Sequence, residues 1–288
     1  MTKPVTAEMV KELRARTGVG MAKCKEALDQ SGGDMDLAIA NLRKAGIASA
    51  VKKEGRETKE GLIGVAESAK ALALIEVNAE TDFVAKNESF QKFLSELALE
   101  VANTTPVSVD AFLQQKFSKD HSLTIDQHRA IVVQSIGENL KVQRIAVFQK
   151  GNDRSLGFYS HMGGKIVTFV EIEGASGEEA LAKDIAMHIA AEAPQYLDSS
   201  EIPADVKAHE EDIAKGQVKG KPENIIAKIV EGKINAFYDQ VCLLRQKFVK
   251  DHTITIEQLV AAKAKEIGKP IKLKRFLRWQ VGEQSVAT

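Results

Sequence analysis

Side chains that could perform covalent chemistry or bind metals are scattered along the 288 residues and form no catalytic pattern. The six histidines lack the His-Glu-x-x-His or Cys-x-x-Cys company typical of zinc sites, and His188 lies in a helical pattern that favours packing. The sequence contains neither a phosphate-binding loop ending in Lys-Ser/Thr nor a Gly-x-Ser-x-Gly nucleophile turn. We therefore predict a binding protein that is not an enzyme and that holds no cofactor and no metal.

Composition and cysteine usage indicate an ordinary globular protein. The chain has 40 basic and 40 acidic side chains, so its formal net charge is zero, and 44% of its residues are hydrophobic. Cys24 and Cys242 lie far apart and suggest no disulfide framework. The sequence has no apolar run long enough to span a membrane and no apolar signal-peptide core after Met1. We expect a cytoplasmic protein that does not interact with membranes.

The charges are unevenly distributed, with a net +3 for residues 1–60, −9 for 61–240 and +6 for 241–288. The basic segment KLKRFLRW (272–279) has the charge needed to bind nucleic acid. Its interspersed apolar residues are, however, typical of an amphipathic strand. We therefore expect no direct contact with nucleic acid. An RNA- or ribosome-associated protein that uses its basic termini is the alternative function.

Three short helical patterns make up residues 1–50. Thr6 is the expected N-cap of the first helix, Gly18 its expected end, and Gly46 the expected end of the third. Three helices of this size can bury a small core between them. The following residues, 51–61 (VKKEGRETKEG), are charged and nearly free of apolar side chains. We predict a three-helix N-terminal module followed by a charged linker.

The rest of the chain repeats itself, which is the most informative feature of the sequence. QKFSKDHSLTIDQ (115–127) returns as QKFVKDHTITIEQ (246–258), displaced by 131 residues, and an earlier part matches at a displacement of 95. Each copy contains strand patterns, helical patterns and a closing strand, as expected for antiparallel sheets covered by helices. We predict an α+β fold with one core subdomain at 62–148 and a second at 149–288.

Changes in the displacement between the copies locate one insertion in each. The first copy has seven additional residues, TDFVAKN (81–87), between its strand and its helix. The second has 43 additional residues, which we expect to form a helical hairpin at about 198–240. The second arm of this hairpin carries an apolar stripe with coiled-coil spacing, and the first arm has too few apolar residues to cover it. This shortage favours another partner for the stripe, such as a second copy of the chain in a homodimer.

TDFVAKN is the string by which the sequence resembles the family of bacterial translation elongation factor Ts. VKELRARTGVGMAKCKEAL, GENLKVQRI, YSHMGGKI and IAMHIAA support the resemblance, which covers nearly the whole chain. It implies a ubiquitin-associated-like N-terminal module, two related core subdomains and a coiled-coil insertion in the second. It also implies a guanine nucleotide exchange factor, whose partner is elongation factor Tu in its GDP-bound and nucleotide-free forms.

The resemblance further implies roles for individual residues. Asp82 and Phe83 would enter beside the partner's Mg²⁺ and nucleotide, where Phe83 would occupy an apolar pocket. Lys86 and Asn87 would shape the loop and cap the next helix. The alternative for Phe83 is packing beneath its own helix at 88–102. The residues implied in displacing the partner's Mg²⁺ are Thr81, Asp82, Phe83, Val84, Ala85, Lys86 and Asn87. The residues implied in partner binding are Arg14, Val19, Gly20, Met21, His161, Phe248 and Val249.

Overall fold

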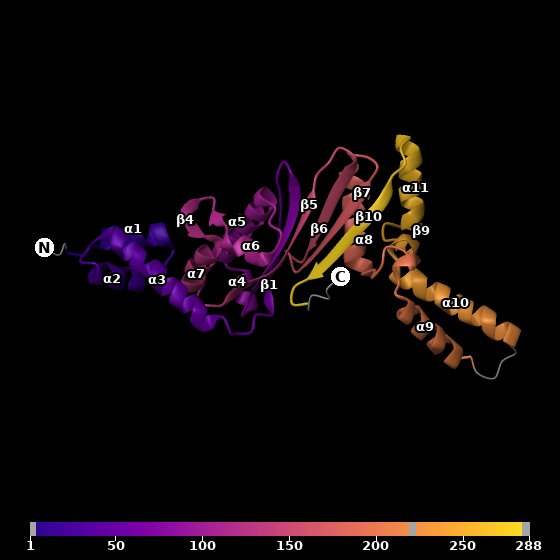
Figure 1. Cartoon of the computed structure of the whole chain (residues 1–288), viewed down its shortest axis with the longest axis horizontal. Helices are drawn as coiled ribbons and strands as arrows, with labels where there is room; N and C mark the ends of the chain where they lie inside the picture. Colours follow the sequence, from indigo (N-terminus) through magenta and orange to yellow (C-terminus); the bar gives the residue numbers. More distant parts are fainter. Residues whose placement is uncertain (1–3, 219–222, 284–288) are drawn as a thin grey trace. The chain divides into compact units, whose positions relative to one another are not determined.

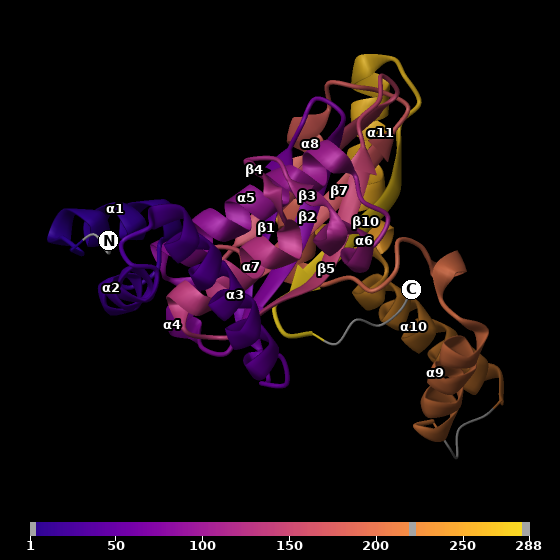
Figure 2. The same cartoon turned by 60° about the vertical axis from the view of Figure 1, so that its left-hand side comes forward.

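The computed structural model describes residues 4–218 and 223–283, whose helices and strands are shown in Figures 1 and 2. These residues form two compact units. Unit 1 comprises residues 4–149, 163–165 and 280–283, and unit 2 comprises the remainder. Both units combine helices with antiparallel strands, which confirms the predicted α+β fold.

Unit 1 begins with the three predicted helices: α1 (Ala7–Thr17), α2 (Met21–Gln30) and α3 (Met35–Lys53). Thr6 caps α1 as predicted, because its hydroxyl accepts a hydrogen bond from the Met9 N–H at 3.3 Å. Gly18 ends α1 in the left-handed conformation that glycine adopts without strain. The buried residues between these helices are Val10, Leu13, Val19, Cys24, Ala27, Leu28, Ala38 and Leu42.

The prediction that the third helix ends at Gly46 is wrong, because α3 continues to Lys53. Gly46 instead lies where α3 packs against α7 (Ile125–Ile136). A Cβ atom at Gly46 would lie 3.1 Å from the Gln134 Oε1 atom, so the glycine permits close helix packing. The linker predicted at 51–61 is therefore shorter in the structure. Its first three residues belong to α3, and its last two belong to the first strand, β1 (Glu60–Glu67).

The N-terminal helices pack against the rest of unit 1. The Arg43 guanidinium donates to the Asp120 carboxylate at 2.9 Å and to the Ser122 hydroxyl at 3.0 Å. The Ser135 hydroxyl donates to the Gly18 carbonyl at 2.6 Å. The helices thus belong to one compact unit with the first sheet. The boundaries predicted for a separate module and for the two core subdomains stay predictions.

A three-stranded sheet in the order β1-β2-β5 forms the centre of unit 1. Its strands are β1 (Glu60–Glu67), β2 (Ala71–Ala79) and β5 (Leu140–Gln149). Strand β2 pairs with both neighbours in antiparallel register and is buried along its whole length. The apolar stripe of α5 (Glu88–Thr104) packs on the sheet, as its helical spacing predicts. The short helix α6 (Val109–Gln114) adds Phe112 to the same core.

A second three-stranded sheet, in the order β10-β7-β6, forms the centre of unit 2. Its strands are β6 (Arg154–His161), β7 (Ile166–Glu173) and β10 (Lys272–Gln280). Helix α8 (Glu179–Glu192) packs on this sheet with Ile185 and Ile189 buried. A Cβ atom at Gly157 would lie 2.5 Å from the backbone nitrogen of Lys183, so the glycine permits the close approach of α8.

The structure confirms the internal repeat. In unit 1 the repeated string forms β3 (Lys116–Phe117), β4 (Asp120–Thr124) and the start of α7. In unit 2 it forms β8 (Lys247–Phe248), β9 (Asp251–Thr255) and the start of α11 (Ile256–Ile267). Thr124 and Thr255 form capping boxes with the glutamine three residues later, and the two helices end at Gly137 and Gly268. The string therefore encodes the same hairpin and helix start twice.

The second insertion forms a pair of helices, as predicted, which are α9 (Ala204–Gly216) and α10 (Glu223–Val241). They lie side by side as a hairpin in Figures 1 and 2. Short 3₁₀ turns flank the pair at Ser199–Glu201 and Leu243–Arg245. The turn predicted at 219–222 lies outside the described residues. The base of the hairpin is closed, since the N–H groups of Gln195 and Tyr196 donate to the Val241 carbonyl at 2.9 and 3.1 Å.

Replacing residues 204–236 by a short Gly-Ser linker is expected to leave the rest of the chain folded. The closing hydrogen bonds and the buried residues Ile202, Val241 and Cys242 at the base are retained. A shift in melting temperature of no more than about 4 °C is expected, equivalent to about 1 kcal/mol for a chain of this size. Thermal unfolding followed by circular dichroism measures this shift, with the unmodified chain as the control. Loss of the cooperative transition would show that the hairpin is part of the core.

Candidate functional site

The seven-residue insertion of the first repeat forms a short helix, α4 (Asp82–Ala85), shortly after β2. Val84 and Ala85 are buried in the core of unit 1. Asn87 caps α5, as predicted, because its Oδ1 atom accepts a hydrogen bond from the Ser89 N–H at 2.8 Å. The insertion is therefore a turn anchored by buried side chains and by a helix cap.

Phe83 lies outside this core, with 78% of its surface exposed. The alternative in which Phe83 packs beneath α5 is therefore wrong. The Lys86 Nζ atom lies 5.9 Å from the centre of the Phe83 ring and 3.2 Å from an Asp82 carboxylate oxygen. A large apolar side chain that an anchored turn holds in water is suited to fill a pocket on a partner protein.

Thr81 joins the α4 turn to the segment that follows α7. Its N–H donates to Glu138 Oε2 at 3.0 Å, and its hydroxyl donates to Glu138 Oε1 at 2.6 Å. Their sequence neighbours are also paired, because the Glu80 Oε1 atom accepts a hydrogen bond from the Asn139 N–H at 2.6 Å. Sequence reasoning missed Glu80, Glu138 and Asn139 as site residues. The bonding partners lie 57 and 59 residues apart, so no local pattern reveals them.

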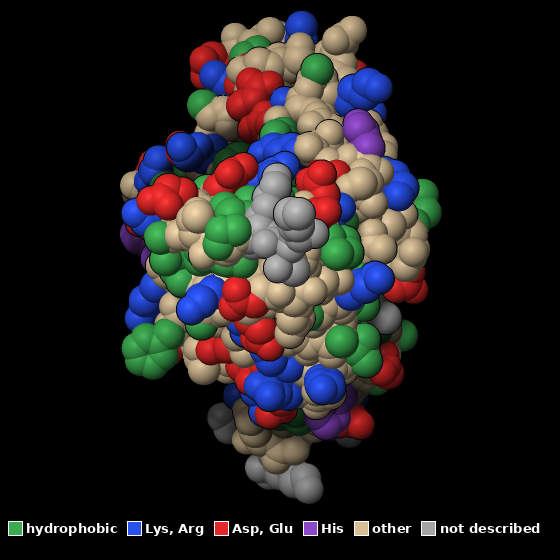
Figure 3. Space-filling model, turned by 90° about the vertical axis from the view of Figure 1, so that its left-hand side faces the viewer, with side chains coloured by type: hydrophobic (Ala, Val, Ile, Leu, Met, Phe, Trp, Pro, Cys, Tyr) green, Lys and Arg blue, Asp and Glu red, His purple; other side chains and the backbone are tan. Residues whose placement is uncertain are grey.

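The loop between α1 and α2 carries the second group of predicted contact residues. Arg14 and Gly20 are exposed, and Met21, the first residue of α2, is 40% exposed. Val19 differs, since only 1% of its surface is exposed and it packs in the core of the three helices. We therefore leave Val19 out of the contact set. On the face shown in Figure 3, apolar side chains are scattered among charged ones.

The C-terminal end of α7 connects these two groups within unit 1. The Ser135 hydroxyl bonds to the Gly18 carbonyl at 2.6 Å, which fixes the loop between α1 and α2. Three residues later, Glu138 bonds to Thr81 beside α4. One helix end therefore anchors both segments that the sequence predicted to contact a partner.

His161, the third predicted contact, lies at the end of β6 in unit 2. It is exposed, and its Nδ1 atom lies 3.3 Å from the Tyr159 hydroxyl oxygen. Met162 follows with a φ of 50° and with 70% of its surface exposed. Sequence reasoning singled out His161 in this turn but missed Met162, whose apolar side chain in a glycine-rich turn was the available signal.

Phe248 and Val249, also predicted as contacts, belong largely to the interior of unit 2. Phe248 is 6% exposed and packs in the hydrophobic core, and Val249 is half-buried against it. The Val249 N–H donates to His188 Nδ1 at 3.2 Å, so the proton of the neutral ring lies on Nε2, which is 3.0 Å from Gln246 Oε1. Burial lowers the pKa of His188, which favours this neutral form. The expected packing of His188 is confirmed. We leave Phe248 out of the contact set, and Val249, which is half-buried, stays a predicted contact.

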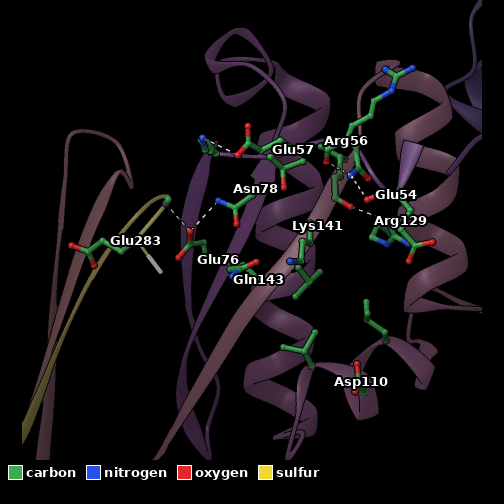
Figure 4. Close-up of a pocket in the computed structure, with 18 residues that line it drawn as sticks. Glu54, Arg56, Glu57, Glu76, Asn78, Asp110, Arg129, Lys141, Gln143 and Glu283 are labelled. Atoms are coloured by element: carbon green, nitrogen blue, oxygen red, sulfur yellow. Dashed lines mark hydrogen bonds and ion pairs between the residues drawn. The ribbon is translucent and has the colours of Figure 1, made fainter. Parts of the chain in front are cut away.

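A cavity of about 740 Å³ in unit 1 (Figure 4) is lined by other residues than the predicted contacts. It is lined by the connection 54–59, by parts of β2 and β5 and by the turn at Gly282. Glu76 is fully buried there, with Arg144 Nε at 2.7 Å and Asn78 Nδ2 at 3.0 Å from its carboxylate oxygens. The lining mixes acidic and basic side chains and includes none of the predicted site residues.

Within residues 4–218 and 223–283, no group of three His, Cys, Asp or Glu side chains is arranged to hold a metal ion. In the same described ranges, no helix combines the length and the apolar character needed to cross a membrane. The exposed side chains among the predicted contacts lie on α4, on the α1–α2 loop and at the end of β6.

The family model and the similar proteins all carry the description elongation factor Ts. The family model described as "Elongation factor TS" matches residues 80–283. The protein named elongation factor Ts of Protochlamydia amoebophila is 64% identical over 279 residues, which cover 97% of this chain and 99% of the relative. Proteins of the same name from Chlamydia caviae and Chlamydia trachomatis serovar D are 46% and 42% identical over 275 residues, covering 96% of this chain and 98% of each relative.

The repeated α+β fold and these matches place the chain among the elongation factors of protein biosynthesis. The family model covers well over half of the chain, and the first of these relatives covers almost all of it. The chain belongs to the elongation factor Ts family.

Proposed function

We propose that this chain is a guanine nucleotide exchange factor that binds elongation factor Tu, GDP-bound and nucleotide-free, and promotes GDP release during translation elongation. In this proposal, Asp82 and Phe83 enter beside the partner's Mg²⁺ and nucleotide. The observation that supports it most is the 78% exposure of Phe83 between an anchored Thr81 and the buried Val84 and Ala85. Membership in the elongation factor Ts family supports elongation factor Tu as the partner. The exposed Phe83 ring is the group that we propose to contact it.

Exchange of this kind is a coupling between two binding equilibria and needs no covalent step. A factor that binds the nucleotide-free partner more tightly than the GDP-bound partner must weaken GDP binding by the same ratio. Each tenfold of that ratio corresponds to about 1.4 kcal/mol. Burial of a phenylalanine contributes roughly 1.5–3 kcal/mol, so Phe83 would supply about ten- to a hundredfold. The protein is thus not an enzyme in the covalent sense and requires no cofactor of its own.

The remaining coupling would be shared among contacts elsewhere on the chain. Arg14, Gly20 and Met21 are exposed on unit 1 and form the proposed second contact. His161, together with Met162, is exposed at the β6–β7 turn and forms the proposed third contact. The residues around Phe83 have supporting roles: Thr81, Val84, Ala85 and Asn87 anchor the turn, and Lys86 lies beside the ring.

The proposed setting is the cytoplasm, where translation elongation takes place. Self-association through the α9–α10 hairpin also stays a prediction. It is supported by the exposure of Ile213 on α9 and of Ile225 on α10, which are apolar side chains on the surface of the hairpin.

The alternative of an RNA- or ribosome-associated protein is less well supported. The basic segment 272–279 forms most of β10, where Leu273 and Trp279 are buried. Lys272 Nζ lies 3.0 Å and Lys274 Nζ lies 3.6 Å from the Glu173 carboxylate. These charges are therefore partly neutralised within unit 2, which favours the exchange function over phosphate binding.

Stopped-flow fluorescence provides the test of the proposed function. Mixing the full chain with elongation factor Tu that carries fluorescent GDP should accelerate GDP release by at least about tenfold, since the coupling must weaken GDP binding. Measuring the affinity of the chain for RNA and for elongation factor Tu at increasing salt separates the two candidate functions, because binding to RNA would weaken steeply with salt and an interface anchored by an aromatic ring would respond less. An unchanged rate of GDP release at saturating concentrations of the chain would contradict the proposal.

A further inference from the structure

Thr81 occupies the N-cap position of α4 but does not cap it. At every other described helix whose N-cap is Ser, Thr, Asp or Asn, the side chain accepts a hydrogen bond from the first turn. Those residues are Thr6, Asp34, Asn87, Ser108, Thr124, Asp198 and Thr255. The Thr81 hydroxyl instead donates to Glu138 Oε1 at 2.6 Å. Thr81 therefore lacks the capping bond that would stabilise α4 locally, and its side chain is used for a contact with a distant part of the chain. Such a departure from local preference is expected where a residue has a functional role.

The bonds of Thr81 belong to a reciprocal arrangement of four residues, Glu80, Thr81, Glu138 and Asn139, which we call the clasp. The ladder between β2 and β5 ends at the pair of Ala79 with Leu140, and the clasp continues the pairing through side chains. The Glu138 carboxylate accepts a hydrogen bond from the Thr81 N–H at 3.0 Å, and the Glu80 carboxylate accepts one from the Asn139 N–H at 2.6 Å. Hydrogen bonds to ionised carboxylates are stronger than those between neutral groups.

The clasp has further support on the side away from α4. Arg56 Nη1 lies 3.3 Å from the Glu80 carboxylate. Asn139 is buried, and its Nδ2 atom donates to the Arg56 carbonyl at 3.2 Å. The Glu80 carboxylate is therefore held by a neighbour outside the insertion, and the bonds of the Asn139 side chain fix the backbone next to Glu138, so the clasp can act as a fixed base for α4.

The second repeat serves as an internal comparison, because it lacks the clasp. The displacement of 131 places Lys269 and Pro270 at the positions of Glu138 and Asn139. A lysine cannot accept a hydrogen bond from an N–H group, and a proline has no N–H to donate. The same repeat also lacks the seven-residue insertion, yet its sheet and helices form. The clasp thus accompanies the insertion and is not required by the shared fold.

We propose that Thr81 and Glu138 are positioning residues, which fix the N-terminal end of α4 so that Phe83 meets the partner in one position. The buried Val84 and Ala85 hold the C-terminal end of α4, and the clasp holds the other. A helix of four residues has little stability of its own and depends on such anchors. The effect on GDP release rests on the proposed function, whereas the effect on the order of α4 does not.

Hydrogen exchange of the full chain tests the positioning without a partner. Glu138→Leu removes both oxygens to which Thr81 donates, and Thr81→Val removes the hydroxyl at nearly constant shape. In both variants the amides of Lys86 and Asn87, which donate to the Phe83 and Val84 carbonyls, should exchange about tenfold faster, while α5 keeps its protection. Thr81→Ser keeps the hydroxyl and should keep the slow exchange of the unmodified chain. Lys269→Leu, at the equivalent position of the second repeat, is the matched control. Unchanged exchange of the Lys86 and Asn87 amides in the first two variants would overturn the proposal.

Release of fluorescent GDP from elongation factor Tu tests the consequence for function. Each clasp variant should slow stimulated release by about tenfold when Phe83 is present and by less than about twofold when Phe83 is already alanine. Equal slowing in both backgrounds, or normal release in the clasp variants, would overturn the positioning role. Normal release by Phe83→Ala alone would overturn the proposed function instead. Hydrogen exchange would then still decide whether the clasp orders α4.

Discussion

Phe83→Ala is expected to slow the stimulated release of GDP from elongation factor Tu by about ten- to a hundredfold, while the chain keeps its melting temperature. The loss of rate follows from the roughly 1.5–3 kcal/mol that burial of the ring in a partner contributes. The stability stays unchanged because 78% of the Phe83 surface is already exposed in the isolated chain. Stopped-flow fluorescence measures the rate, and a thermal melt of the isolated variant measures the stability.

Two matched variants separate the proposed role of Phe83 from general effects. Leu99→Ala removes another exposed apolar side chain, from α5, and should change neither the rate nor the melting temperature. Phe93→Ala removes a fully packed ring from the same helix and should cost roughly 3–5 kcal/mol of stability. A normal rate of release with Phe83→Ala would refute the proposed role, as would a loss of stability comparable to that of Phe93→Ala.

The second large effect concerns the buried ion pair of unit 1. Arg144→Met should destabilise the folded chain by about 3–5 kcal/mol, because Glu76 is fully buried and would lose the guanidinium 2.7 Å from its carboxylate. The hydrogen bonds that Glu76 accepts from Asn78 and from the Gly282 N–H do not supply a compensating charge. Urea-induced unfolding followed by circular dichroism measures the change in free energy.

The repeat provides the comparison for this prediction. Glu171 in unit 2 is likewise buried and pairs with Arg275 at 2.7 Å, but it also pairs with Arg154 at 3.2 Å. Arg275→Met therefore leaves one guanidinium beside Glu171 and should destabilise the chain by clearly less than Arg144→Met. Equal losses of unfolding free energy in Arg144→Met and Arg275→Met would contradict the prediction. They would show that the unpaired charge of the buried glutamate does not determine the destabilisation.

Much of the fold could be predicted from the sequence because its signals are local and occur twice. The strand predicted from LKVQRIAVFQ coincides with β5, and the two arms predicted for the hairpin correspond to α9 and α10. The repeat supported the prediction of β5 with a second example, β10, whereas the hairpin was predicted from the apolar spacing of its own residues. Gly46 is the exception, since its role depends on α7, which lies far along the chain.

The candidate site was predictable as segments but not as individual side chains. The resemblance marked Val19 and Phe248 as contacts, yet both are buried, because a matching string does not show which of its residues face solvent. The exposure of Phe83 decided between the two roles considered for it. The clasp depends on pairing at the ends of β2 and β5 between residues 57 and 59 positions apart, which no short pattern encodes.

The anchoring of α4 also affects the speed and reuse of the protein. Loops that become ordered only on binding lose conformational entropy at each encounter, and this loss lowers the affinity of the encounter. Here Val84, Ala85 and the Asn87 cap order the turn during folding. A surface that is shaped beforehand allows binding with little rearrangement. In the proposed function, each copy of the chain can therefore present α4 to successive partner molecules in the same conformation.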